Sequence, residues 1–520
     1  MLPHRKTTRM KLYLLLGLVL LATPVLANTI PLLALTEQGE IRDGIVAELT
    51  LETRRGTGRV FLDTFPLTRV TTQTSMRFAQ QVACSVLEKD CKKIDFFFTV
   101  RAPPGIIGGP SAGAVATILT VATLEGKPVK DDVAMTGTIN SGGAIGPVGG
   151  TLEKIEAAQK KGITTVLIPP GTKTQNQQGV DIDPIQYGKE IGLKIIEVAT
   201  IEEALPYFLP NYNARPHISL TIDTEYADRM KRIAEGLCAD SSEEFNNGKY
   251  YAAASACFRT RVTNARTNPT EENASLLQKD IKTFEQELLQ HEIQSLTDVQ
   301  TIMMVNERIR ETKEAILNGS KSNLAYAKQR LYSAQLWSTF LGTPSPPQIL
   351  RLKEGCQHKI AEAEERYSYV VSITPPLATP VRTTLDQAYT FHTDEDFIDC
   401  LYSASKAKAE ANAIMGVIGI REEALPSVLR TKLNVVNQEI ARGQTKGVFP
   451  IIGYSYYELA ESLSEDSPTT SLLFAEYALE FATLNTHTDT FPAHETYQYV
   501  FFGIGSLLIL IGGIAYVRNL

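Results

Sequence analysis

One serine in this sequence lies where a glycine-rich turn meets an apolar run. The stretch PGIIGGPSAG occupies residues 104–113 and is followed directly by AVATILTVATL. Proline suits the first turn of a helix, so the pattern places Ser111 at a helix start, where free backbone N–H groups converge. Such a turn can bind a phosphate, expose a nucleophilic hydroxyl beside donors for an oxyanion, or only reverse the chain. Ser111 is therefore the first candidate for chemistry.

A nucleophilic serine needs a base, and the surrounding region restricts the choice. The seven histidines all fall outside residues 41–209, which excludes a Ser-His-Asp triad within that region. Lysine is the known alternative base, but its ordinary pKa lies near 10.4. Bringing that pKa to about 7–8 requires destabilising the ammonium by roughly 3–5 kcal/mol. Burial and a helix N-terminus both act in this direction.

Lys154 satisfies these conditions better than the lysines that follow it. The segment GPVGG (146–150) opens a predicted helix, and Lys154 falls on its first turn, where the helix dipole disfavours positive charge. Lys160 and Lys161 lie near the end of the same helix and are expected to be ordinary solvated lysines. Ser111 and Lys154 therefore form a candidate nucleophile and base.

Other chemistries are excluded by missing motifs. The sequence contains no HExxH, no CxxC and no GxxxxGK[ST], so neither a zinc site of these types nor a Walker-type ATPase is predicted. We expect no metal and no cofactor. The net charge of −7 provides no basic field, so nucleic acid is not an expected partner.

The elements that must position Ser111 and Lys154 belong to a mixed α/β region, and a helical region follows it. Residues 41–209 alternate strand and helix patterns, whereas residues 215–490 show long helical periodicities broken at TPSPP (343–347) and TPPLATP (374–380). Charged residues of the helical region are expected to form solvated faces. Strands are predicted at 44–53, 58–63, 94–100, 133–139, 164–169 and 193–198, and helices at 73–87 and starting at Ser111, Thr151 and Ile201.

The two ends of the chain predict export and anchoring. Residues 1–27 have a basic start, an apolar run and a small-residue exit, typical of a signal peptide cut after Ala27, although an uncleaved anchor is an alternative. Residues 499–517 are uncharged and long enough to span a bilayer. The sequence therefore predicts a single-pass protein of the cell membrane, with residues 28–497 on the extracytoplasmic side. Six cysteines permit disulfides there, and pairing of sequence neighbours would give Cys84–Cys91, Cys238–Cys257 and Cys356–Cys400.

Several motifs in one order resemble the proteolytic domain of Lon-type peptidases. They are GPSAG (109–113), AMTG (134–137) and GPVGGTLEK (146–154), and the resemblance covers about residues 41–209. It implies that Ser111 is the nucleophile and Lys154 the general base. By the same resemblance, Thr136 orients Lys154, and Gly109, Pro110 and Ala112 complete the nucleophile loop that supplies backbone N–H groups to the oxyanion.

The sequence departs from the family pattern at two points. Gly108 stands where the family usually has an acidic residue, which puts any contact made by that acid in doubt. The ATP-driven unfoldase module of the family is not recognised in the sequence, so the resemblance implies that the substrates are unfolded polypeptides, exposed loops or short peptides. Peptidase domains of this family form rings, so a homo-oligomer is an open expectation.

We therefore interpret the chain as an α+β protein in which a Lon-type proteolytic α/β domain precedes an α-helical domain and a C-terminal transmembrane helix. The expected function is that of a membrane-anchored, extracytoplasmic, ATP-independent serine endopeptidase. One alternative is a degenerate peptidase that acts as a surface binding or assembly protein. Another is a small-molecule kinase of the GHMP type, whose phosphate loop is faintly similar to PPGIIGGPSAGA (103–114).

Overall fold

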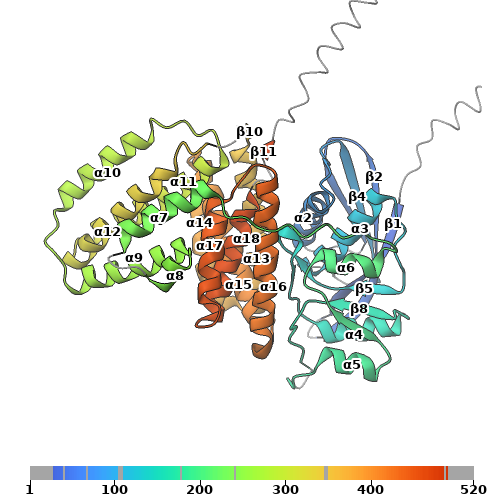
Figure 1. Ribbon diagram of the computed structural model, residues 1–520. Coiled ribbons are helices and arrows are strands. Elements are labelled where there is room, and N and C mark those ends of the chain that lie inside the picture. The colour runs from blue at the N-terminus through green and yellow to red at the C-terminus, as the bar shows by residue number, and fades with distance from the viewer. Residues whose placement is uncertain are drawn as a thin grey trace, which may run out of the picture.

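The N-terminal part of the chain is built on a seven-stranded sheet, which Figure 1 shows beside a C-terminal helical part. The computed structural model describes residues 27–38, 41–65, 68, 70–103, 109–175, 179–238, 242–344, 349–484 and 488–489. The strand order is β3-β4-β2-β1-β5-β8-β9. Strand β2 is antiparallel to both of its neighbours, and the remaining pairs of the sheet are parallel. The strands of this sheet are β1 (Ala27–Gln38), β2 (Ile41–Arg55), β3 (Val60–Phe65), β4 (Ile94–Arg101), β5 (Val133–Met135), β8 (Thr165–Ile168) and β9 (Lys194–Glu197).

Helices cover the sheet on both faces and bury two separate hydrophobic cores. The larger core lies against α2, α3 and α6, and residues such as Met76 and Ile118 are fully buried in it. The smaller core lies against α4 and α5 and includes Leu33 of β1 and Ile155 of α4. The sheet thus carries α3 and α4, the two helices that follow the candidate motifs. The helices are α2 (Val70–Val86), α3 (Gly113–Glu125), α4 (Thr151–Lys160), α5 (Pro184–Glu190) and α6 (Ile201–Phe208).

The six predicted strands are present, and two differences from the prediction matter. The sheet begins at Ala27 rather than near residue 41, because β1 lies between β2 and β5. Pro31 lies within β1 and weakens the strand pattern of this segment in the sequence, because proline is rare inside a sheet. The predicted strand 133–139 is also divided into β5 and β6 (Thr138–Ile139), and β6 pairs instead with β7 (Ile145–Gly146).

The C-terminal part is helical, as predicted, and its first helix is α7. The predicted break at 374–380 contains the short helix η4 (Pro375–Leu377) between α13 and α14. Helices α13, α14 and α15 enclose their own core, and Figure 1 shows α10 at the end of the helical domain remote from the sheet. The helices of this domain are α7 (Thr224–Leu237), α8 (Glu243–Asn246), α9 (Tyr250–Thr267), α10 (Ala274–Leu288), α11 (Leu296–Asn318), α12 (Lys321–Trp337), α13 (Leu352–Ile373), α14 (Ala378–Thr393), α15 (Phe397–Ile418), α16 (Leu425–Thr445), α17 (Ile451–Leu463) and α18 (Pro468–Ala482).

The expectation that charged residues of this region form solvated faces is wrong at the contact with the α/β domain. Lys359, Glu362, Lys408 and Glu480 are all less than a tenth exposed. They are buried because each carboxylate faces both ammonium groups across ion pairs of 2.8–3.0 Å. Mutual pairing offsets the cost of removing these charges from water.

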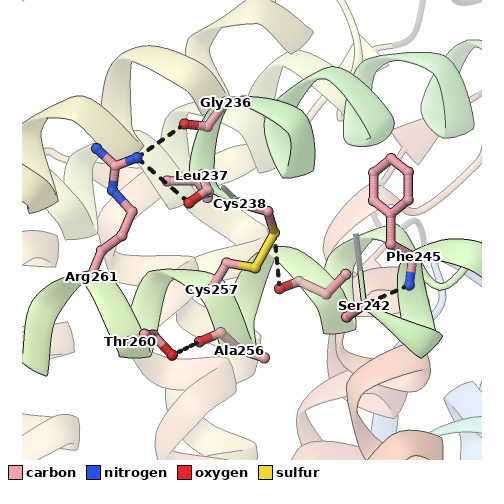
Figure 2. Close-up of a disulfide and its surroundings, with 10 residues drawn as sticks. Gly236, Leu237, Cys238, Ser242, Phe245, Ala256, Cys257, Thr260 and Arg261 are labelled. Carbon is pink, nitrogen blue, oxygen red and sulfur yellow. Dashed lines mark hydrogen bonds between the residues drawn. A yellow bond between two sulfur atoms is a disulfide. The ribbon is translucent and has the colours of Figure 1, made fainter. Parts of the chain in front are cut away.

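The three disulfides confirm the predicted pairing of sequence neighbours, Cys84–Cys91, Cys238–Cys257 and Cys356–Cys400. Figure 2 shows the second of them, which joins the end of α7 to α9. Beside it, the Arg261 guanidinium donates to the carbonyls of Gly236 and Leu237, so α9 also satisfies the last backbone acceptors of α7.

Loss of the Cys356–Cys400 bridge should destabilise the protein more than loss of the Cys84–Cys91 bridge. The first closes a separation of 44 residues and the second only 7. Chain entropy then predicts losses of about 4 and about 2 kcal/mol in the free energy of unfolding. Paired cysteine-to-alanine variants measured by thermal unfolding check the order. Equal losses, or a larger loss for the short bridge, would contradict this reasoning.

The predicted signal peptide and transmembrane helix lie outside the described residues, apart from Ala27, which opens β1. Within the described part of the chain, no helix combines the length and the apolar character that crossing a membrane requires.

Candidate active site

The Ser111 turn leads directly into a buried helix. Gly109 precedes the short helix η1 (Pro110–Ala112) with φ 129°, a backbone conformation that favours glycine. Helix α3 starts at Gly113, and its first eleven residues are buried. Ser111 itself remains half-buried, so its hydroxyl lies at the edge of the core rather than inside it.

The interrupted strand between β5 and β6 holds this turn. The Gly137 N–H donates to the Ser111 carbonyl at 3.2 Å, and the Gly137 carbonyl accepts from the Ala114 N–H at 3.1 Å. Thr136, the preceding residue, is fully buried, and its N–H donates to Leu167 of β8. Pairing with β8 ends after Thr136, because Gly137 bonds to the Ser111 turn instead. The residue that follows Thr136 is therefore joined to the serine turn.

Lys154 completes the cluster from the first turn of α4. Its side chain is 2% exposed. The Nζ atom donates to Thr136 Oγ1 at 3.1 Å and to the Gly149 carbonyl at 3.0 Å. Gly150 caps the helix in the left-handed conformation, with φ 65°, which turns the chain so that Gly149 faces back toward its own helix.

Burial lowers the pKa of Lys154 to about 7. The dominant cause is desolvation of the ammonium, and the neighbouring Glu153 carboxylate opposes it only in part. The amine can therefore be neutral near physiological pH, as the sequence analysis predicted. Lys160 and Lys161 are exposed, which confirms that they are ordinary solvated lysines.

The structure brings Lys154 and Thr136 into contact through the threonine hydroxyl. Ser111 is connected to them through its backbone, because its carbonyl accepts from the N–H of Gly137, the neighbour of Thr136. Gly109, Pro110 and Ala112 flank the serine as expected, and the Gly113 N–H is occupied by the Pro110 carbonyl. Gly108 lies outside the described residues. The catalytic and oxyanion roles of these residues remain predictions.

A close approach of β2 to α4 sets the position of Lys154, and sequence reasoning missed it. A Cβ added at Gly44 would overlap the Glu153 carbonyl of the first turn of α4. That obstacle is backbone and cannot rotate away, so only glycine lets α4 lie this close to the strand. No periodic pattern marks a glycine of this kind inside a predicted strand.

Gly44→Ala should therefore displace the first turn of α4 and lower peptidase activity by about 100-fold, the cost of misplacing a catalytic group by about 1 Å. Overpacking should also destabilise the fold by about 1–3 kcal/mol. Gly236→Ala is the matched control, because its Cβ meets only side-chain atoms of Tyr332 and Leu336, at 3.2 Å or more. Equal activity in the two variants would exclude this role for Gly44.

Sequence reasoning also missed a contribution from the helical domain. The Gly149 N–H donates to the hydroxyl of Tyr369 at 2.9 Å, and the Arg366 guanidinium donates to the Ile139 carbonyl. Both side chains come from α13, more than 200 residues beyond the Ser111–Lys154 motifs, and no local signal connects them with the site.

The part of the chain that contains this site is similar to known proteins. Residues 49–211 match the family model of the Lon protease (S16) C-terminal proteolytic domain. The chain is 35% identical over 163 residues to a Lon protease of Vibrio parahaemolyticus, which covers 30% of this chain and 20% of that protein. It is 37% identical over 146 residues to a Lon protease of Escherichia coli, which covers 26% of this chain and 18% of the relative.

A third relative, a Lon protease of Fervidobacterium nodosum, is 37% identical over 118 residues, or 22% of this chain and 14% of that protein. The chain therefore spans no more than a fifth of the length of these three curated relatives. The family model likewise ends at residue 211, before the first helix of the helical domain.

Proposed function

We propose that this chain uses its Lon-type serine peptidase domain, residues 49–211, to hydrolyse peptide bonds in unfolded or flexible polypeptides. The observation that carries the proposal is the environment of Lys154. A lysine that is 2% exposed, bonded to Thr136 and lowered in pKa to about 7 is poised to act as a base.

The proposed reaction makes use of this environment of Lys154. The Ser111 hydroxyl attacks the scissile carbonyl while neutral Lys154 accepts its proton, and the resulting ammonium later donates a proton to the leaving amine. A neutral amine has two N–H bonds and one lone pair. Thr136 Oγ1 and the Gly149 carbonyl each accept a hydrogen bond from one N–H of the amine. The lone pair is then left to accept the serine proton. Backbone N–H groups around Gly109–Ala112 stabilise the oxyanion, and water then hydrolyses the acyl-enzyme on Ser111.

Independence of ATP is part of the proposal. The matches to relatives cover the proteolytic domain, and the sequence has no Walker-type GxxxxGK[ST] motif. A peptidase without an unfoldase must receive chains that are already extended. The expected substrates are therefore unfolded polypeptides, exposed loops and short peptides.

The proposed location is the extracytoplasmic face of a cell membrane. Three disulfides support it, because such bonds persist in oxidising compartments. The apolar stretches at residues 1–27 and 499–517 support export and anchoring from sequence alone. A ring-shaped homo-oligomer remains a proposal that rests on the resemblance only.

Incubation of the full chain with casein, without ATP or Mg²⁺, tests this function. We expect cleavage, and we expect a serine-reactive fluorophosphonate to block it and to appear on Ser111 in peptide mass spectra. Cleavage that required ATP would contradict the proposed independence. A folded chain that left casein intact and did not react at Ser111 would favour the binding or assembly protein.

A further inference from the structure

One face of α13 lies directly on the peptidase domain. Glu365 accepts a hydrogen bond from Ser75 of α2 at 3.1 Å, and Arg366 donates to the carbonyl of Ile139 in β6. One turn further along, Tyr369 reaches Gly149, just before α4. Positions 362, 365, 366 and 369 have the i, i+3, i+4, i+7 spacing of a single helix face. This face therefore meets the strand segment near Ser111 and the segment that carries Lys154.

Tyr369 is connected to Lys154 through a single residue. The Gly149 N–H donates to the Tyr369 hydroxyl at 2.9 Å, while the Gly149 carbonyl accepts from Lys154 Nζ at 3.0 Å. Gly149 is exposed, and a Cβ added there would meet nothing within 4 Å, so the space on that side of the residue is open. Apart from Lys154 itself, the Tyr369 phenol is the side chain that hydrogen-bonds Gly149 in the described part of the chain. The Gly149 carbonyl in turn accepts one of the two N–H bonds of the neutral amine.

Arg366 acts on the other side of the site. Its guanidinium is buried and donates to the Ile139 carbonyl, two residues after Gly137, which bonds to the Ser111 backbone. Arg366 and Tyr369 are less than one helical turn apart, so α13 bridges the serine side and the lysine side of the site.

Buried charges keep α13 in this position. Lys359 and Glu362 of α13 pair with Glu480 and Lys408 of the same domain, and Lys408 Nζ also donates to Ser141 Oγ at 3.0 Å. Ser141 belongs to η2 (Ser141–Gly143) of the peptidase domain and donates in turn to Glu480. Removing one partner from such a network leaves an uncompensated charge in the interior, so displacement of α13 from this position is costly.

We propose that the helical domain is a built-in positioning partner of the peptidase, in which Tyr369 of α13 holds Gly149 so that the lone pair of Lys154 faces Ser111. The inference rests on the proposed function for its catalytic meaning. Tyr369 is a positioning residue, because it reaches the base only through Gly149. The helical domain thereby supports the active site of the same chain.

Tyr369→Phe removes this support and little else. Without the hydroxyl, Gly149 can move from Lys154 and admit water to the amine. Since desolvation is the main cause of the lowered pKa, water should return that pKa toward 10.5. Glu153 is the charged group that acts on the pKa of Lys154, and Arg366 is the charged group that acts on the pKa of Tyr369. The substitution alters neither of these groups.

The measurement is the titration of Lys154 in the full chain. NMR of ¹³C-labelled lysine monitors it, and the Lys154 signal is assigned as the one that is missing in Lys154→Arg. In Tyr369→Phe we expect the pKa to rise by about one unit and kcat on casein at pH 7 to fall about fivefold, with KM unchanged. Tyr367→Phe is the matched control, because Tyr367 lies on the same helix and packs with the core of α13, α14 and α15. It should behave as the wild type.

The titration separates the two proposals. A Tyr369→Phe protein that is folded, with both the Lys154 titration and kcat unchanged, overturns the positioning role. If the wild type cleaves nothing but Lys154 titrates low and shifts in Tyr369→Phe, the positioning role stands and the proposed function fails. A wild-type Lys154 that titrates near 10.5 overturns both.

Discussion

Ser111→Ala is expected to lower cleavage of casein by at least about 10³-fold, which is the effect of removing the nucleophile from a serine peptidase. The variant keeps the backbone bond from Gly137 to the residue 111 carbonyl, so the turn and α3 should be undisturbed. Any remaining rate reflects the oxyanion donors and substrate binding. Thermal unfolding should differ from the wild type by no more than about 0.5 kcal/mol, because Ser111 is only half-buried.

Ser85→Ala is the control for this substitution, because Ser85 is an exposed serine on α2 of the same domain. It should cleave casein at the wild-type rate. Preparations of the variants should be purified in parallel, so that a contaminating protease gives the same background in each. Cleavage by Ser111→Ala at the rate of Ser85→Ala would remove Ser111 from the mechanism.

The local part of the site is predictable from sequence because its determinants are local. Ser111, Thr136 and Lys154 lie within 44 residues, and each depends on a short pattern, such as the Gly-Gly turn that starts α4. The direction of the Lys154 pKa shift could also be expected, because burial and a first helical turn both disfavour the ammonium. The burial that produces the shift, however, depends on how α4 packs on the rest of the domain.

The remaining features depend on contacts between distant segments. Pro31 argues against a strand, yet β1 forms because β2 pairs with it over its whole length. In α13 the charged residues have ordinary helical spacing, which looks the same whether a helix face meets water or another domain. Only the packing of α13 on the peptidase domain shows that Glu362, Arg366 and Tyr369 are part of the active-site support.

Lys154→Met should lower activity by about 10³-fold and remove its pH dependence. In the wild type, activity should rise with pH through an apparent pKa near 7, because only the neutral amine accepts the serine proton. Methionine has a similar length but cannot accept a proton, so the remaining activity should be small and flat. A rate profile with the wild-type midpoint in Lys154→Met would show that another group is the base.

The same substitution should stabilise the fold, and by an amount that depends on pH. Lys154 has a pKa of about 7 when folded and 10.5 when unfolded. Between these values the unfolded chain binds a proton that the folded chain does not, so wild-type stability rises with pH by about 1.4 kcal/mol per unit. Below pH 7 the full cost of burying the ammonium is present, and methionine removes it. The stability advantage of Lys154→Met over the wild type should therefore shrink by about 2–3 kcal/mol between pH 6 and pH 9.

Denaturant unfolding at the two pH values measures this difference, and Lys160→Met is the matched control. Lys160 is exposed on the same helix, so its substitution should change stability equally at both pH values. The two lost hydrogen bonds, to Thr136 and Gly149, offset part of the gain but do so at every pH in this range. The pH dependence thus isolates the burial of charge from the loss of contacts. If the stability advantage of Lys154→Met over the wild type stays constant from pH 6 to pH 9, Lys154 is as well solvated as Lys160. The proposal that Lys154 is the base would then be contradicted.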